Sequence, residues 1–383
     1  MQPVVYSLIL LFISWFQNDM MKIFFLINGL GLGNSTRCHA IIQRLKTRGA
    51  DIEVVTSGNG LWYFSDKAEV SAVHEIGSLA YGSKDGAISV VRTFASVGRM
   101  LAVIRANVRK LSNILDDAQP DAVVTDSDYN FIPVKRRKIP LVALNNADVV
   151  WHSYFKFPDR PVSIRAQFFC VEMLDYRFHR LVPDLVLSPS LDPKIEQSGG
   201  NVRRIGPIVR QGYNPTQGHR PPKRAVVMLS GSVFGTPVRF ERDDYPIHID
   251  VVGREAPSGW SGSSNIIFHG KIKDTYPLLK QADITVVNGG FSAVSEMFWM
   301  RKPLVVVPVP NHAEQWINAR TIEQLCVGRM ARQFNYESVM IDSVNEIERF
   351  DAGYAALPLA EDGAAQAADA ILDIATRGPG GGQ

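Results

Sequence analysis

The stretch that decides the fold is 283–319, with the sequence DITVVNGGFSAVSEMFWMRKPLVVVPVPNHAEQWINA. The β-branched run at 284–287 is typical of a strand that is buried on both faces, and the run at 304–307 predicts a second strand of the same kind. A Gly-Gly turn and a helix are expected between the two runs, and another helix is expected after the second run. The stretch therefore predicts a strand–helix–strand–helix unit of a parallel sheet.

Polar residues follow each of these strands. Gly289 and Gly290 follow the first strand. Glycine has no side chain, so a ligand could approach the backbone closely at this turn. The polar side chains on the two predicted helices are Ser292, Glu296, Glu314, Gln315 and Asn318. Helix N-termini at the carboxyl edge of a parallel sheet bind anionic and nucleotide ligands. We therefore expect a nucleotide at this edge.

This pattern resembles the donor-nucleotide motif of GT-B glycosyltransferases. It is close to glycosyltransferase family 28, which includes the enzyme that makes peptidoglycan lipid II, and a similar motif occurs in family 1. In the motif, an acid after the Gly-Gly turn bonds the donor ribose, and a later acid-Gln pair bonds the donor sugar. The resemblance implies the ribose role for Glu296 and the sugar role for Glu314 and Gln315, while Asn318 would touch the sugar or fix its loop.

The fold implied by the resemblance is α/β, with two Rossmann-like domains that face each other across a cleft. The implied activity is hexosyl transfer from a nucleotide sugar, with UDP as the expected nucleotide, to a glycan or lipid-linked acceptor. Such a protein would serve the synthesis of surface polysaccharide or glycolipid, in the cytoplasm or at the inner face of the membrane. Two alternatives stay open: a nucleotide-sugar hydrolase or 2-epimerase, and a non-catalytic subunit that binds a nucleotide sugar.

Length and composition fit such a protein. The chain of 383 residues can form two domains with sizeable cores, and 46% hydrophobic with 21% charged residues is typical of a globular protein. A net charge of +3 gives no reason to expect nucleic acid as a partner. Cys38, Cys170 and Cys326 lie far apart, so they predict neither a zinc site nor a disulfide framework. This cysteine usage suits a reducing cytoplasm.

The expected division of the chain has four parts. Residues 1–20 are interpreted as an extension outside the fold, because the apolar run at 4–16 is too short for a membrane-spanning helix; a membrane-attachment segment is the alternative. An N-terminal acceptor-binding domain is expected over 21–212 and a donor-binding domain over 222–360, joined by a segment rich in Gly, Pro and polar residues. The helix at 361–377 could cross back to the first domain.

The first domain opens with a predicted strand at 22–27, followed by alternating glycines at 29, 31 and 33. The G-x-G-x-x-G spacing of a dinucleotide site is absent, so this turn is interpreted as a loop that lines the cleft. Long helices are predicted at 88–115 and 163–181.

The donor phosphates would meet backbone amides and polar side chains. The candidates are Ser230, Gly231 and Ser232 after the first strand of the second domain, together with Gly31, Gly33 and the Gly289–Gly290 turn. The resemblance implies that Ile272 contacts the nucleobase. It also implies a reaction without metal ion or other cofactor.

The catalytic base is where the sequence departs from its relatives. Many inverting GT-B enzymes carry Gly-x-Gly-His-x-x-Arg after the first strand, whereas this chain has Asn34 in the position of the His. An amide cannot take a proton at neutral pH. Two outcomes follow. Either Asn34 orients the acceptor and the base is Asp126 or Asp128, which follow a predicted strand, with His152 as a third candidate, or the protein is not an ordinary inverting transferase.

Overall fold

The computed structural model describes residues 20–78, 83–84, 87–88, 97–195, 198–216, 218–229, 238, 240–241, 244–258, 260 and 263–378. Residues 1–19 of the expected N-terminal extension lie outside these ranges, and so does the candidate phosphate loop Ser230–Ser232. No helix in the described ranges is long and apolar enough to cross a membrane.

The first domain is built on a seven-stranded parallel sheet with strand order β3-β2-β1-β6-β7-β8-β9. Its strands are β1 (Lys22–Ile27), β2 (Asp51–Thr56), β3 (Ala72–Glu75), β6 (Ala122–Asp126), β7 (Leu141–Leu144), β8 (Leu185–Pro189) and β9 (Val202–Ile205). Its helices are α2 (Leu32–Thr47), α3 (Gly58–Phe64), α5 (Val97–Ala118), α6 (Ile132–Arg136), α7 (Ala147–Lys156), α8 (Val162–Gln167) and α9 (Met173–Leu181), with the π-helix η1 (Phe168–Glu172) between the last two. The short strands β4 (Ser83–Lys84) and β5 (Ala87–Ile88) form a separate antiparallel pair.

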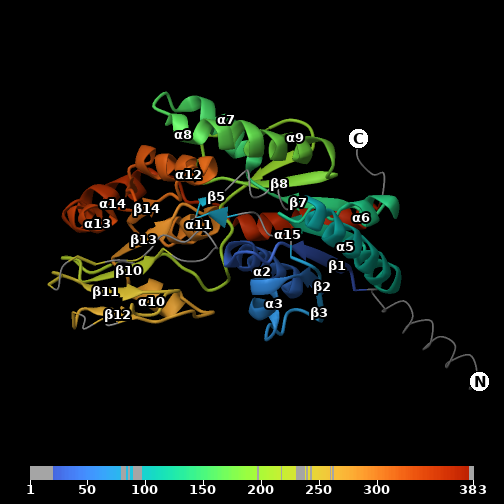
Figure 1. The fold of residues 1–383 in the computed structure, drawn as a ribbon, viewed down its shortest axis with the longest axis horizontal. Helices are drawn as coiled ribbons and strands as arrows, with labels where there is room; N and C mark the ends of the chain where they lie inside the picture. Colours follow the sequence, from blue (N-terminus) through green and yellow to red (C-terminus); the bar gives the residue numbers. More distant parts are fainter. Residues whose placement is uncertain are drawn as a thin grey trace, which may run out of the picture.

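The second domain is built on a six-stranded parallel sheet with strand order β12-β11-β10-β13-β14-β15. Its strands are β10 (Arg224–Met228), β11 (His248–Val251), β12 (Ile266–Phe268), β13 (Ile284–Asn288), β14 (Leu304–Val307) and β15 (Gly328–Met330). Its helices are α10 (Tyr276–Gln281), α11 (Phe291–Trp299), α12 (Ala313–Gln324), α13 (Tyr336–Asn345) and α14 (Ile347–Ala356), followed by α15 (Gly363–Arg377). Figure 1 shows the two sheets side by side, which confirms the predicted architecture of two parallel α/β domains.

The stretch 283–319 forms the centre of the second domain. β13 pairs with β10 on one side and β14 on the other, and every residue of β14 is fully buried. These strands carry β-branched residues almost throughout because helices cover both faces of the sheet. The carboxyl ends of β13 and β14 therefore lie side by side, and α11 and α12 begin next to them.

Two predicted helices differ from the observed ones. Ile88 belongs to β5, and α5 begins only at Val97. The predicted helix at 163–181 is divided into α8, η1 and α9 by a π-helical turn at Phe168–Glu172. Apolar periodicity reveals the helical stretch but not the extra residue that a π-turn inserts.

The last helix, α15, packs against α2 of the first domain. Ala367, Ala368 and Ile371 are fully buried in the core cluster that also contains β1 and α2 residues. Arg44 on α2 donates to the Asp362 carboxylate just before α15, at 2.8 Å for Nη2. Figure 1 shows this helix, in red, lying with the first domain although it follows the second in sequence.

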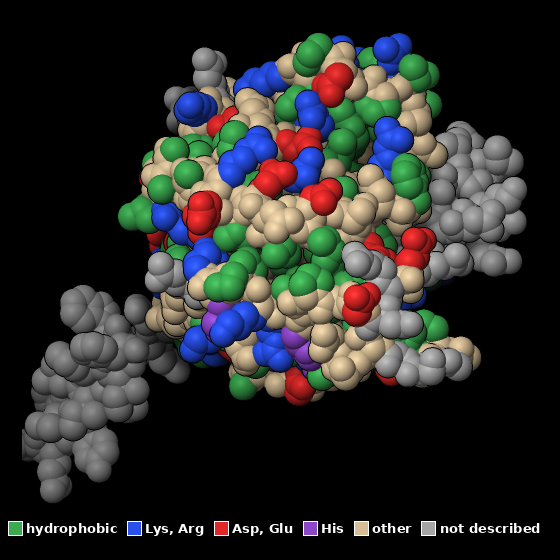
Figure 2. Space-filling model, turned by 90° about the vertical axis from the view of Figure 1, so that its left-hand side faces the viewer, with side chains coloured by type: hydrophobic (Ala, Val, Ile, Leu, Met, Phe, Trp, Pro, Cys, Tyr) green, Lys and Arg blue, Asp and Glu red, His purple; other side chains and the backbone are tan. Residues whose placement is uncertain are grey.

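Figure 2 shows the left-hand side of the molecule as drawn in Figure 1, where the second sheet and its helices lie. On the coloured residues of this face, Lys and Arg side chains alternate with Asp and Glu among apolar groups.

Candidate active site

A cavity of about 370 Å³ lies between the two domains. The first domain contributes the turn after β1 with the start of α2, the ends of β6 and β7, and the η1–α9 segment. The second domain contributes the loops after β11 and β12, the turn after β13 with α11, and the start of α12. The carboxyl edges of both sheets thus face one cavity, which is where open parallel sheets bind ligands.

Most of the described residues predicted as site residues line this cavity: Gly31, Gly33, Asn34, Ile272, Gly290, Ser292, Glu296, Glu314 and Gln315. Gly289, Asn318, Asp126 and Asp128 are not among the lining residues. The structure therefore brings the predicted donor-site residues together from four separate segments, and it leaves both predicted catalytic aspartates outside the lining.

Gly289 and Asn318 lie just behind the lining. Asn318 is buried, and its Nδ2 donates to the Gly289 carbonyl oxygen over 2.9 Å. A Cβ on Gly289 would lie 2.5 Å from the carbonyl oxygen of Gln315. Only glycine fits between β13 and α12 here, so the pair holds the turn that faces the cavity.

Glu296 forms a buried, bidentate ion pair with Arg210. Arg210 Nε donates to Oε1 over 2.7 Å and Nη2 donates to Oε2 over 3.0 Å. Burial alone would lower the pKa of Arg210, but the Glu296 carboxylate raises it above its ordinary value. Each carboxylate oxygen can accept more than one hydrogen bond, so the ion pair orients Glu296 and leaves it able to bind hydroxyls.

Asp126 forms a second bidentate ion pair, with Arg37 of α2. Arg37 Nε donates to Oδ2 over 2.6 Å, Nη2 donates to Oδ1, and the Cys38 thiol contacts Oδ2 at 3.3 Å. Asp126 is fully buried. This pairing places the guanidinium between the carboxylate and the cavity, since Arg37 lines the cavity and Asp126 does not.

Asp128 is also buried and engaged. Its Oδ1 accepts hydrogen bonds from the backbone N and from Nδ2 of Asn130, each over 2.9 Å. Burial raises the pKa of Asp128 above its ordinary value. The hydrogen bonds close an Asx turn after β6, so the observed role of Asp128 is to shape this strand end. His152 is half exposed, at 49%, and approaches Asp148 at 3.5 Å.

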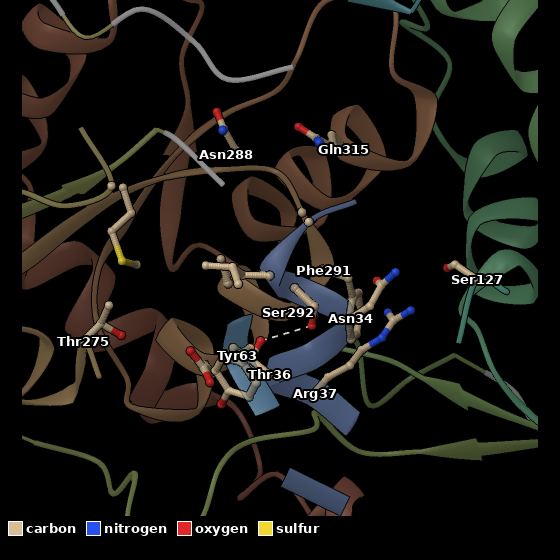
Figure 3. Close-up of a pocket in the computed structure, with 18 of the residues that line it drawn as sticks. Asn34, Thr36, Arg37, Tyr63, Ser127, Thr275, Asn288, Phe291, Ser292 and Gln315 are labelled. Atoms are coloured by element: carbon tan, nitrogen blue, oxygen red, sulfur yellow. Dashed lines mark hydrogen bonds between the residues drawn. The ribbon is translucent and has the colours of Figure 1, made fainter. Parts of the chain in front are cut away.

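Asn34 lines the cavity at the start of α2, and its Nδ2 approaches the Asn28 carbonyl oxygen at 3.5 Å. Figure 3 shows the Asn34 and Arg37 side chains pointing to the same side of the helix, toward Ser127. Ser292 Oγ donates to the Gly33 carbonyl oxygen over 2.9 Å. The glycine turn of the first domain is thereby held against α11 of the second.

Three further carboxylates line the cavity: Glu172, Asp175 and Glu314. From the sequence, Glu172 and Asp175 had no predicted role, and Glu314 was expected only to bind the donor sugar. Asn146 Nδ2 donates to Glu314 Oε1 over 3.1 Å, across the domain boundary. Burial raises the pKa of Glu172 to about 8, and the neighbouring Glu314 carboxylate adds to the rise. The i, i+4 spacing of Asp175 and His179 could have marked Asp175 as a site residue in the sequence. No such pattern marks Glu172, because its position at the cavity depends on the π-turn.

Two lysines of the loop after β12 line the cavity and reach the first domain. Lys271 Nζ donates to Asn59 Oδ1 over 2.8 Å, and Lys273 Nζ pairs with Asp66 Oδ2 at 2.9 Å. Both ammonium groups lie over the ring of Trp62, at 4.1 and 4.9 Å from its centroid. The cavity lining therefore contains both carboxylates and ammonium groups, and the ammonium groups suit a phosphate.

The fold agrees with the comparisons to known proteins. Residues 21–194 and 262–346 match the family model described as glycosyl transferase family 1. An uncharacterized glycosyltransferase of Methanosarcina acetivorans is 24% identical over 347 residues, covering 85% of this chain and 90% of that protein.

Solved glycosyltransferases share the fold. MurG of Acinetobacter baumannii superposes with a TM-score of 0.57 at 13% identity, covering 92% of this chain and 99% of MurG. The Streptomyces sp. SF2575 glycosyltransferase SsfS6, solved with thymidine diphosphate, gives a TM-score of 0.55 at 15% identity and covers 92% of this chain and 99% of its own.

The two facing sheets and the cavity between them define a GT-B glycosyltransferase. The chain belongs to glycosyl transferase family 1.

Proposed function

We propose that this glycosyltransferase transfers a hexose from a UDP-linked donor to a glycan or lipid-linked acceptor. The observation that carries the proposal is the convergence of Glu296, Glu314 and Gln315 on one cavity behind the Gly289–Gly290 turn. Two neighbouring strand ends thus offer a carboxylate for ribose hydroxyls and an acid-amide pair for sugar hydroxyls. The structure of SsfS6 with thymidine diphosphate supports a pyrimidine nucleoside diphosphate as the carrier.

The cations of the cavity suit the leaving diphosphate. Lys271 and Lys273 lie in the loop that also carries Ile272, the proposed nucleobase contact. Positive charge and backbone amides at Gly31, Gly33 and Gly290 would stabilise the charge that develops as the sugar leaves. We therefore include metal independence in the proposal, and EDTA is expected to leave the rate unchanged.

The helical layer α7–α9 supports a lipid-linked acceptor. Its large apolar side chains exposed to solvent include Phe155, Phe169, Val171, Leu174 and Leu181. Exposed basic residues on the same helices are Lys156, Arg165 and Arg177. Apolar groups flanked by cations favour the surface of an anionic membrane, so we propose peripheral contact with the cytoplasmic face of the membrane.

The proposal is tested by measuring UDP release from UDP-glucose, UDP-galactose and UDP-N-acetylglucosamine, with and without a short-chain polyprenyl phosphate or an alkyl glycoside. We expect release with at least one donor and at least tenfold acceleration by one acceptor. Equal release without acceptor would indicate a hydrolase, and conversion of the donor sugar in NMR spectra would indicate an epimerase. UDP binding without turnover of any donor would indicate a binding subunit.

A further inference from the structure

The proposed transfer requires a group that accepts the proton of the acceptor hydroxyl, and the structure brings neither predicted aspartate to the cavity. Asp126 accepts hydrogen bonds from Arg37 with both carboxylate oxygens, and Asp128 closes the turn after β6. Asn34 carries no titratable group. The proton acceptor must therefore be sought among the carboxylates that do line the cavity.

Asp175 is a poor acceptor of a proton. Tyr129 Oη donates to its Oδ1 over 2.6 Å, Asn145 Nδ2 donates to its Oδ2 over 3.0 Å, and His179 Nδ1 lies 3.2 Å from Oδ1. Burial alone would raise the pKa of Asp175, but the partners around it, His179 foremost, lower the pKa overall. A carboxylate stabilised in its ionised form has little tendency to take up a proton.

Glu172 has the opposite environment. It is 8% exposed and is the last residue of η1, and it lines the cavity. A π-turn spans five residues, so it brings Gln167 and Glu172 together, and Gln167 Nε2 donates to Glu172 Oε1 over 2.7 Å. π-Turns within α-helices are frequent at functional sites.

Gln167 also fixes Glu172 relative to the donor domain. Its Oε1 accepts a hydrogen bond from the backbone N of Ala313 over 2.9 Å, at the first residue of α12. The next residue, Glu314, belongs to the pair proposed to hold the donor sugar. Glu172 is thereby held by the first domain against the place where the second domain presents the sugar.

We infer that Glu172 is the catalytic proton acceptor of the transfer. This inference rests on the proposed function. The acceptor oxygen forms a bond to the anomeric carbon, the bond from that carbon to the diphosphate oxygen breaks, and its electron pair leaves with UDP. The hydroxyl proton passes to the Glu172 carboxylate, which becomes a carboxylic acid and later returns the proton to water.

The titration of Glu172 depends on the groups that face it. These are the carboxylate and the backbone N of Glu314 from α12, the Asp175 carboxylate from α9 and the amide of Gln167 from α8. The hydrogen bonds from Gln167 and from the Glu314 backbone oppose the rise in pKa but are outweighed by burial and the two carboxylates. Burial and the nearby carboxylates favour the protonated form, so the carboxylate that acts as base forms only as the pH rises. The rate should therefore increase with pH between about 7 and 9, around the raised pKa of about 8.

The test compares wild type with Glu172→Gln, Glu172→Asp and the exposed-charge control Glu348→Gln, using the donor and acceptor that wild type turns over best. Glu172→Gln should lower kcat by about 100-fold or more and lose the alkaline rise in kcat/KM, with the donor KM within about threefold. Glu172→Asp should be slower than wild type but keep the alkaline rise. Glu348→Gln should match wild type.

The thermal shift with UDP shows whether each variant is folded and binds the donor nucleotide. If wild type is active and Glu172→Gln keeps the same kcat and pH profile, the role of Glu172 is overturned while the proposed function stands. A wild-type rate that falls as the pH rises would also overturn it, because the protonated form would then be the active one. Absence of wild-type turnover with every donor would overturn the proposed function together with this inference.

Discussion

At the scale of single residues, two buried ion pairs, Arg37–Asp126 and Arg210–Glu296, lie next to the cavity. Both are bidentate, and each member is at most 9% exposed. Removing one partner of such a pair leaves an uncompensated buried charge, which is costly to stability. Arg37 and Asp126 therefore have a structural role in the site, whether or not they also take part in catalysis.

We predict that Asp126→Asn lowers the free energy of unfolding by about 3–5 kcal/mol, because the Arg37 guanidinium would remain buried without its counter-charge. Urea denaturation at pH 7 measures the change. The matched control is Asp373→Asn, whose partner Arg377 is 57% exposed, and its cost should stay below about 1 kcal/mol. A stable Asp126→Asn variant that has lost turnover would instead support Asp126 as a catalytic group.

The sequence could predict which residues of the second domain meet at the cavity, because each follows a buried strand in a recognisable order. Glu296 and Glu314 are separated by one strand and one turn, and parallel pairing of β13 with β14 brings their helices together. The partner of Glu296 could not be predicted, because Arg210 lies 86 positions away, just before the segment that joins the two domains. The engagement of Asp126 by Arg37 likewise depends on the pairing of β1 with β6.

At the scale of elements, η1 and α15 matter most for the site. The apolar run at 163–181 predicted a continuous helix, and nothing in its composition signals the extra residue of the π-turn. That turn decides whether Glu172 faces the cavity, so the proposed proton acceptor could be found only in the structure. The final helix was expected at 361–377, and its position follows from its packing against α2, which lies far away in the sequence.

The start of α15 approaches the end of β9 so closely that only glycines fit. A Cβ on Gly363 would lie 1.9 Å from the carbonyl oxygen of Gly206. We predict that Gly363→Ala lowers the free energy of unfolding by about 1–3 kcal/mol, as expected for overpacking against atoms that cannot move away. Gly199→Ala is the control, since no atom lies within 4 Å of the corresponding Cβ. Thermal or urea unfolding measures the change. Equal unfolding midpoints for the two variants would contradict the prediction, because they would show that α15 can shift without loss of stability.

At the scale of the whole molecule, contacts across the cavity hold the two domains together. Ser292 binds the glycine turn of the first domain, Lys271 and Lys273 reach α3 and the segment after it, and Gln167 binds the start of α12. The two-domain α/β architecture followed from strand composition and the resemblance. The contacts between the domains could not be predicted. They join side chains that lie far apart in the sequence and whose residue types show little preference for a particular partner.

The central claim is that the cavity between the domains binds a uridine diphosphate through Glu296. The most direct test is the shift in melting temperature on adding UDP to wild type, Glu296→Gln and the control Glu348→Gln, each relative to its own ligand-free value. A ligand at about 100 times its Kd stabilises the folded state by about 2.7 kcal/mol, which should raise the wild-type and control melting temperatures by several degrees. Glu296→Gln should lose most of that shift, whereas no shift in wild type, or an equal shift in Glu296→Gln, would contradict the claim.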